Sequence, residues 1–201
     1  MKIHLGFSTT NSIFSKLIRV FTRSDASHVY IRVYDEFLKT PLIFHADWSG
    51  VEIEHAEKFD IENKVIEEFV IDDDRLDRAI KNCLWHLGKR YNYFRLINLG
   101  LFVYFKRWFV RKIKNPTINP RSLICVDFVI YALNDSGITR LPIGVMTQRH
   151  LHAWCNENFK DLSWVKYTPQ FGTYENVKAK VLADELNGFF LTCFFRCLFM
   201  L

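Results

Sequence analysis

Three side chains in this sequence have the types and spacing that thiol chemistry requires, namely Cys125, His28 and His45. A cysteine nucleophile needs an imidazole within hydrogen-bond reach to accept its proton, and that imidazole needs a third group to orient it. Cys125 opens an apolar run, 124–137, that we expect to be a buried helix ending at Gly137. The alternative for this position is an unreactive core cysteine.

The expected place of Cys125 at a helix start also predicts its ionisation. Unsatisfied backbone N–H groups and the positive end of the helix dipole favour a thiolate over a thiol. The same N–H groups would stabilise the oxyanion that forms when the thiolate attacks an acyl carbon. We therefore expect a depressed pKa for Cys125, and no such depression for Cys83 and Cys155.

The two histidines fall on segments that we expect to be neighbouring strands, 27–34 and 41–47, joined by a short polar link. If these strands pair antiparallel with His28 opposite His45, both side chains point to the same face with their Cβ atoms close together. Both imidazoles would then face one site. Each histidine taken alone has a plainer interpretation, as a strand residue without a catalytic role.

The elements that must position these residues follow from hydrophobic periodicity and turn signals. Strands come before helices along the chain, which indicates the α+β class. We expect strands at 2–8, 27–34, 41–47, 51–54 and 64–71. We expect helices from Asn11 or Ser12, after Asp72–Asp74, at 96–110, at 124–137 and at about 145–157. The antiparallel sheet would pack against the helix that carries Cys125.

Length and composition limit which folds and which cellular compartments are compatible with this chain. The chain has 201 residues, of which 49% are hydrophobic, so one domain can bury a sizeable core. We expect a catalytic domain over 1–187 and an apolar tail over 188–201. The five cysteines form no Cys-x-x-Cys pair, which favours free thiols in a reducing compartment. With no secretory signal at the start, we expect a cytoplasmic protein that is membrane-associated if its apolar segments reach a bilayer.

The net charge of +5 is concentrated in the segment 106–121, which carries six Lys and Arg residues. Such a patch suits anionic lipid, nucleic acid or an acidic surface, or simply keeps the chain in solution. The tail 188–201 is too short to cross a bilayer. Segments 96–114 and 188–201 are therefore candidate contacts with a membrane surface, while packing or oligomerisation is the alternative for the tail. We expect no specific nucleic acid partner.

Four segments together resemble the circularly permuted branch of the NlpC-type papain-like superfamily. They are SHVYIRV (27–33), LIFHADWSGVEI (42–53), LGKRYNYF (87–94) and ICVDFVIYAL (124–133). Lecithin:retinol acyltransferase-like enzymes and bacterial, phage and poxvirus proteins belong to that branch. Its histidine strand precedes its cysteine helix, as His28 precedes Cys125 here. The resemblance spans about residues 1–155 and implies a papain-like fold.

The resemblance also implies roles and a reaction. His28 matches the base, His45 the polar third member on the next strand, and Cys125 the nucleophile. The implied reaction is hydrolysis or acyl transfer at an amide or ester bond through a cysteine thioester, on a peptide, cell-wall or lipid-like substrate. No cofactor or metal is required. Neither Asp127 nor the helical, basic insertion at about 96–121 has a counterpart in the family pattern.

Five further residues are candidates for substrate binding: Tyr30, Asp47, Trp48, Tyr91 and Tyr93. Tyr30 stands two residues after the expected base, where the family commonly has a small residue, and would narrow the pocket. Asp47 and Trp48 follow His45, and the other two tyrosines follow the expected helix end at Gly88. Plain packing is the alternative for these aromatic side chains.

The competing function is a non-enzymatic binding module of the same fold that uses the basic 106–121 patch. A metal site at His150, His152 and Cys155 has less support, because these donors fall on an expected helix without a fourth ligand. Core and surface roles are favoured there. Thiol reactivity separates the enzyme from the binding module, since an active site makes one cysteine react selectively.

Overall fold

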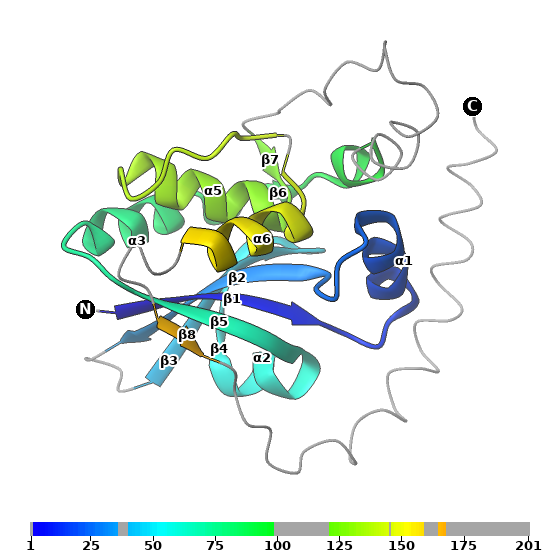
Figure 1. The fold of residues 1–201 in the computed structure, drawn as a ribbon, viewed down its shortest axis with the longest axis horizontal. Coiled ribbons are helices and arrows are strands. Elements are labelled where there is room, and N and C mark those ends of the chain that lie inside the picture. Colours follow the sequence, from blue (N-terminus) through cyan, green and yellow to red (C-terminus); the bar gives the residue numbers. More distant parts are fainter. Residues whose placement is uncertain (1, 36–39, 99–120, 145, 159–164, 168–201) are drawn as a thin grey trace. The chain divides into compact units, whose positions relative to one another are not determined.

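In a computed structural model of the chain, the structure describes residues 2–35, 40–98, 121–144, 146–158 and 165–167 (Figure 1). The chain divides into two units, 1–169 and 170–201, and everything described below belongs to the first. Most of the expected insertion at 96–121, including nearly all of its basic patch, lies outside the described residues. The expected tail at 188–201 lies outside them entirely.

The fold is α+β, as the sequence predicted, and is built on one antiparallel sheet with the strand order β4-β3-β2-β1-β5-β8. The strands are β1 (Lys2–Thr9), β2 (His28–Asp35), β3 (Thr40–Asp47), β4 (Gly50–His55), β5 (Lys64–Asp72) and the short β8 (Val165–Tyr167). The first five occur where alternation and turn signals predicted them. A separate ribbon pairs β6 (Arg90–Tyr91) with β7 (Ser122–Leu123) in parallel.

The helices are α1 (Ile13–Thr22), α2 (Ala56–Glu62), α3 (Leu76–Trp85), α5 (Cys125–Asp135) and α6 (Gln148–Asn158), and residues 93–98 are also helical. α1 begins as expected, because the Ser12 side chain accepts the Ser15 N–H at 3.1 Å and caps the helix. α2 was not expected. Its seven residues are too few to show a helical period, and it is capped by a histidine, His55.

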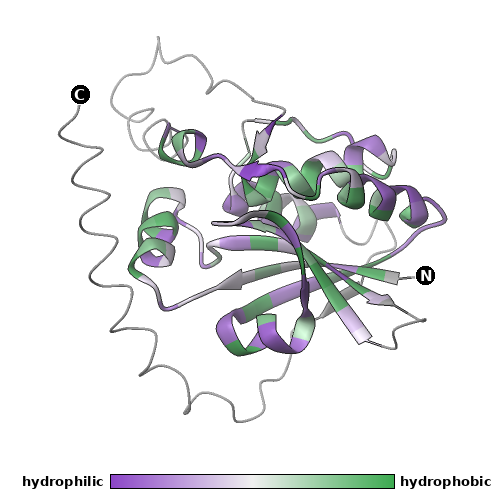
Figure 2. Ribbon diagram, turned by 180° about the vertical axis from the view of Figure 1, so that it is seen from behind, coloured by the Kyte–Doolittle hydropathy of each residue, from purple (hydrophilic) through white to green (hydrophobic). Residues whose placement is uncertain are grey.

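The main core lies between the sheet and helices α3, α5 and α6, while α2 covers the other face of the sheet (Figure 1). α5 is apolar on nearly every side, as Figure 2 shows, which is the pattern of a helix buried in a core. On β2, Val29 and Ile31 face this core, whereas Tyr30 packs on the α2 side. Side chains of a strand alternate between faces, so the odd and even positions of β2 separate the two layers.

α1 has apolar side chains on its outer side as well as its inner side. Ser15 and Thr22 are buried and Phe14 and Ile18 pack inward, whereas Ile13, Leu17 and Val20 are 61%, 38% and 71% exposed. Figure 2 shows hydrophobic residues along this helix at the edge of the molecule. An ordinary surface helix has polar residues on its outer side, so the exposed apolar residues of α1 depart from the usual arrangement.

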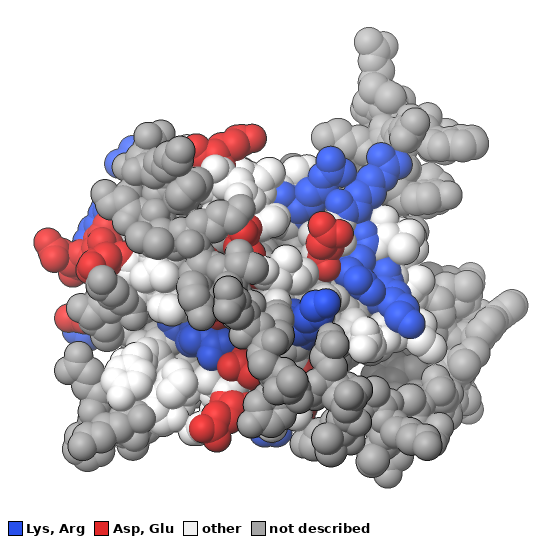
Figure 3. Space-filling model, turned by 60° about the horizontal axis from the view of Figure 1, so that its bottom comes forward, with Lys and Arg blue, Asp and Glu red and all other residues white. Residues whose placement is uncertain are grey.

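Basic side chains accompany α1, which carries Lys16 and Arg19 and ends at Arg23. Figure 3 shows Lys and Arg gathered on the right-hand side of the molecule, the side on which α1 lies in Figure 1. Among the described residues, no helix is long and apolar enough to cross a membrane.

Candidate active site

The two histidines meet, but through a different strand register from the one expected. β2 and β3 pair with Tyr30, not His28, opposite His45, a shift of two residues. Alternation determines which face a residue occupies, but the turn between the strands sets the register, and the sequence does not reveal that turn. A shift of two keeps both histidines on one face, and His28 Nε2 lies 3.1 Å from His45 Nδ1.

His45 is buried between the His28 ring and the carboxylates of Glu52 and Glu54. Its Nε2 has no hydrogen-bond partner among the described residues, and one oxygen each of Glu52 and Glu54 on β4 lies 3.6 Å away. That distance is too long for a hydrogen bond, but the two negative charges favour a proton on Nε2. Burial lowers the pKa of His45, against the charges of Asp47 and the two glutamates. The neutral ring therefore keeps its proton on Nε2 and offers Nδ1 as an acceptor.

His28 is the first residue of β2, and its ring is packed between His45 and Phe59 of α2, with centroid separations of 5.3 and 6.1 Å. Burial, and then the charge of His45, hold the pKa of His28 well below its ordinary value of 6.5. The ring is therefore neutral at neutral pH. With its Nε2–H donated to His45, the lone pair of His28 is on Nδ1.

Cys125 is the first residue of α5, as predicted, and is 1% exposed. The Gln148 amide on α6 donates to the Ser27 carbonyl at 3.1 Å and to Cys125 Sγ at 3.6 Å. A hydrogen bond from the Val29 N–H also acts on the sulfur. The thiol thus lies on the α5 side of β2, next to Ser27 and Val29. The ring of His28, the residue between these two, lies on the α2 side. In the described part of the chain, no hydrogen bond joins Cys125 directly to His28.

The expectation of a depressed pKa at Cys125 is wrong. Burial raises the pKa of this thiol to about 11, although hydrogen bonds from Val29 and Val126 N–H and from the Gln148 amide oppose the rise. The loss of solvent disfavours the thiolate more than the helix N-terminus favours it. Asp127 in the first helical turn also raises the pKa. Burial raises the pKa values of the other two described cysteines as well.

This ionisation predicts a pH profile for alkylation. The thiolate is the attacking species, so iodoacetamide should modify Cys125 slowly at neutral pH and faster as the pH rises toward about 11. Peptide mass spectrometry at a series of pH values measures the rate at each cysteine. Cys83 and Cys155, fully buried without an exposed edge, serve as internal controls and should react more slowly. A rate at Cys125 that is already maximal at neutral pH would show a thiolate–imidazolium pair instead.

Aromatic rings gather next to the thiol. Trp48 stacks on Tyr93 with centroids 5.5 Å apart and contacts Phe14 at 4.2 Å, and the Tyr93 hydroxyl donates to the Trp48 carbonyl at 2.6 Å. Tyr91 lies 5.2 Å from the Tyr93 ring. Burial, and then the charge of Cys125, raise the pKa of Tyr91, which places this tyrosine close to the thiol. Three of the five candidate binding residues therefore lie together.

Asp47, a fourth candidate, orders the turn between β3 and β4. Its carboxylate accepts the Ser49 backbone N–H at 2.9 Å and the Ser49 hydroxyl at 2.8 Å. Its charge also opposes the effect of burial on the pKa of His45. Asp47 thus orders the turn through hydrogen bonds and acts on His45 through its charge.

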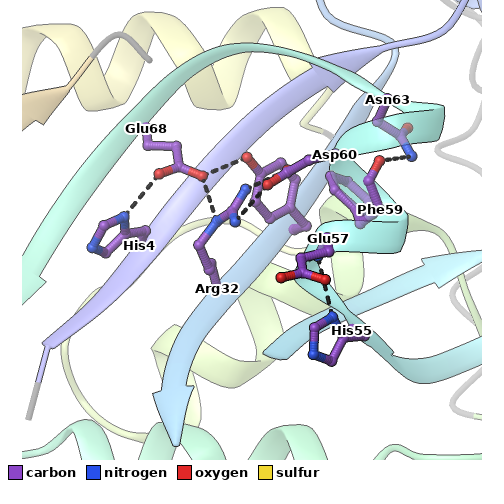
Figure 4. Close-up of polar contacts among 9 residues, drawn as sticks. His4, Arg32, His55, Glu57, Phe59, Asp60, Asn63 and Glu68 are labelled. Carbon is purple, nitrogen blue, oxygen red and sulfur yellow. Dashed lines mark hydrogen bonds and ion pairs between the residues drawn. The ribbon is translucent and has the colours of Figure 1, made fainter. Parts of the chain in front are cut away.

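Tyr30, the fifth candidate, lies apart from this cluster, in the polar network shown in part in Figure 4. It is fully buried, its ring lies against Gly6, and its hydroxyl donates to Glu68 at 2.6 Å. Glu68 also accepts from Arg32 Nε at 2.9 Å and meets His4 Nδ1 at 2.8 Å. These contacts link β1, β2 and β5 and make Tyr30 a core residue, so its expected place at a substrate pocket is not supported.

Asp127, for which the sequence suggested no role, forms a buried ion pair with Arg95. The Arg95 Nε and Nη2 groups both donate to the Asp127 carboxylate, the latter at 3.0 Å, and both side chains are 1% exposed. Arg95 N–H also donates to Asn92 Oδ1 at 2.9 Å. The pair ties the segment that carries the two tyrosines to the helix of Cys125. No local motif reveals it, because the partners are far apart in the sequence.

The three donors near the chain's last described helix have separate partners. His150 Nδ1 lies 3.1 Å from Thr147 Oγ1, His152 Nε2 lies 2.5 Å from Glu67 Oε2, and Cys155 is buried in the core. These are core and surface roles. Within the described ranges, no group of three or more His, Cys, Asp or Glu side chains is arranged to hold a metal ion.

Comparisons with known proteins add a fold likeness. No protein-family model matches this sequence, and no curated protein matches it. Among solved structures, the chain resembles the crystal structure of a protein from Escherichia coli O157:H7 described as the metalloprotein yiiX, DUF1105. The TM-score is 0.52 at 13% identity, and the match covers 85% of this chain and 97% of that one. At such low identity the similarity shows a shared fold.

Proposed function

We propose that this chain is a circularly permuted, papain-like thiol hydrolase or acyltransferase, with Cys125 as nucleophile, His28 as base and His45 as the group that orients the base. One observation carries the proposal. The thiol meets the start of β2 at Ser27 and Val29, and His28, which is hydrogen-bonded to His45, is the residue between them. A nucleophile, a base and an orienting group so placed form the set that acyl transfer uses.

The tautomers set the direction of proton transfer. The charges of Glu52 and Glu54 favour the proton on the outer nitrogen of His45, whose Nδ1 then accepts the His28 Nε2–H. This leaves the lone pair of His28 on Nδ1, free to accept a thiol proton. The His28 ring lies on the α2 side of β2 and the thiol on the α5 side, so the proposal requires the His28 side chain to turn toward Cys125 when substrate binds.

The resting pair is a neutral thiol and a neutral imidazole. As Cys125 Sγ attacks the substrate carbonyl carbon, its proton passes to His28 Nδ1 and the carbonyl π electrons move to the oxygen. The N-cap residue Ile124 makes no side-chain cap, so backbone N–H groups at the start of α5 can receive this oxyanion. Collapse expels the leaving group, which takes the proton from His28 and leaves a thioester. Water or another nucleophile, deprotonated by His28, then attacks the thioester carbonyl, the Cys125 sulfur leaves, and the proton on His28 returns to it.

The surroundings suit an acyl compound with an apolar portion. Trp48, Tyr91 and Tyr93 offer aromatic faces beside the thiol, and such surfaces bind apolar or peptide groups. Peptide, cell-wall and lipid-like acyl substrates all meet this description. The described cysteines are free thiols, which supports a reducing compartment such as the cytoplasm.

An acyl-transfer assay tests the proposal. p-Nitrophenyl acetate should acetylate one cysteine, Cys125, at neutral pH, and intact-mass and peptide analysis should locate the acetyl group there. Cys83 and Cys155 are internal controls, and Cys125→Ser should remain unmodified under the same conditions. Equal acetylation of all accessible thiols, or none, would favour the competing hypothesis of a binding module that uses the basic 106–121 patch.

A further inference from the structure

Helix α1 leaves a face of apolar side chains that the described part of the protein does not bury. The hydroxyl of Ser15 lies on the protein side, 3.0 Å from Thr9 Oγ1 and in contact with Ser27 Oγ. On the outer side, Ile13 and Val20 are more than half exposed. Exposed apolar area costs about 25 cal/mol per Å², so several exposed apolar residues close together are a candidate binding surface.

The neighbouring helical segment, 93–98, also exposes apolar side chains. Its Arg95 is buried, whereas Phe94 and Ile97 are 80% and 45% exposed. Leu96 of this segment packs with Phe14 and Ile18 of α1, so the two helices lie side by side. The two adjacent helices thus each expose apolar side chains in addition to those they pack against one another.

Charge indicates what covers this surface, which we define as Ile13, Leu17, Val20, Phe94 and Ile97. α1 carries Lys16 and Arg19, ends at Arg23, and contains no Asp or Glu. Apolar side chains flanked by basic ones are the pattern of a helix that lies in the interface of a bilayer containing anionic lipid.

We propose that this surface, formed by α1 and segment 93–98, binds the face of membranes that contain anionic lipid. A symmetric dimer through the same face is disfavoured, because an isologous contact brings together two surfaces that carry the same positive charge. The proposal rests on burial and charge, and holds whether or not Cys125 is catalytic. It also places the membrane beside the aromatic cluster, since Phe14 of α1 contacts Trp48 at 4.2 Å.

Vesicle flotation of the full-length protein tests the surface. We expect binding to vesicles of phosphatidylcholine with phosphatidylserine, weaker binding to phosphatidylcholine alone, and a decrease with added salt. The double variant Ile13→Ser/Val20→Ser should lower the partition coefficient by about tenfold or more, because two inserted side chains are lost. The matched control is Leu84→Ser/Trp85→Ser, which changes residues 47% and 82% exposed on α3, at the opposite side of Figure 1. It should bind as the unmodified chain does.

A second variant shows whether a loss of binding by the first variant is caused by misfolding. Lys16→Glu/Arg23→Glu leaves the apolar residues in place and should abolish the preference for phosphatidylserine, with circular dichroism unchanged. The proposal is overturned if the full-length protein binds neither vesicle, or if both α1 variants bind as the unmodified chain does. It is also overturned if size-exclusion chromatography shows that Ile13→Ser/Val20→Ser splits a dimer while vesicle binding is unchanged.

Discussion

Replacing His28 with alanine should slow acetylation of Cys125 at neutral pH by about 10²–10⁴-fold, the usual contribution of a general base. The effect is large because the thiol is neutral at that pH: burial raises its pKa to about 11, so little thiolate forms without a base. The measurement is the single-turnover rate of acetyl transfer from p-nitrophenyl acetate, followed by mass spectrometry. Cys125→Ser supplies the background.

The pH dependence distinguishes a base from a merely structural residue. As the pH rises toward the pKa of Cys125, the thiol ionises unaided, so the rates of His28→Ala and the unmodified chain should converge. In the unmodified chain the rate should persist on acidification until His28 is protonated, which occurs well below pH 6.5 because burial lowers its pKa. His45→Gln, which keeps an acceptor for His28, should have the smaller effect. A constant ratio between variant and unmodified rates at every pH would show that His28 acts only on the fold.

Replacing Asp127 with alanine should lower the free energy of unfolding by about 3–5 kcal/mol, the cost of leaving a buried charge without its partner. Arg95 and Asp127 are each 1% exposed, so water cannot take the place of the lost carboxylate. Urea unfolding followed by circular dichroism measures the change.

Two further variants show whether the ion pair is responsible. Arg95→Met/Asp127→Leu removes both charges and should recover much of the lost stability, because apolar replacements of a buried pair are often neutral. Asp73→Asn breaks the partly exposed pair with Arg75 and should have a much smaller effect. If the double variant is no more stable than Asp127→Ala, the loss comes from packing and not from an unpaired charge.

Much of the fold was predictable because hydrophobic alternation and caps act locally. The strands β1 to β5, the start of α1 at Ser12 and the start of α5 at Cys125 all follow from residues close together in the sequence. α2 was missed because a helix of seven residues gives too short a pattern. The β2–β3 register was wrong by two because a hairpin register depends on its turn.

In the candidate site, the meeting of the two histidines was predictable, whereas the electrostatics were not. Strand alternation alone brings His28 and His45 to one face, which the hydrogen bond between them confirms. The pKa of Cys125 was predicted in the wrong direction because burial depends on packing from distant segments. Gln148 was missed for the same reason: a lone amide in a helical first turn carries no motif, and its contact with the thiol arises only in the folded chain.

The order of the strands has a consequence for how the protein is made. β1 to β5 lie within residues 2–72, and the pairings of β4 with β3, β3 with β2 and β2 with β1 join strands that follow one another in the chain. On the ribosome these segments emerge first and can pair before Cys125 is synthesised, since local contacts form early. The histidine pair can then form before the proposed nucleophile is synthesised. A nascent chain that stops before residue 125 would have the proposed proton acceptor without the sulfur that would use it.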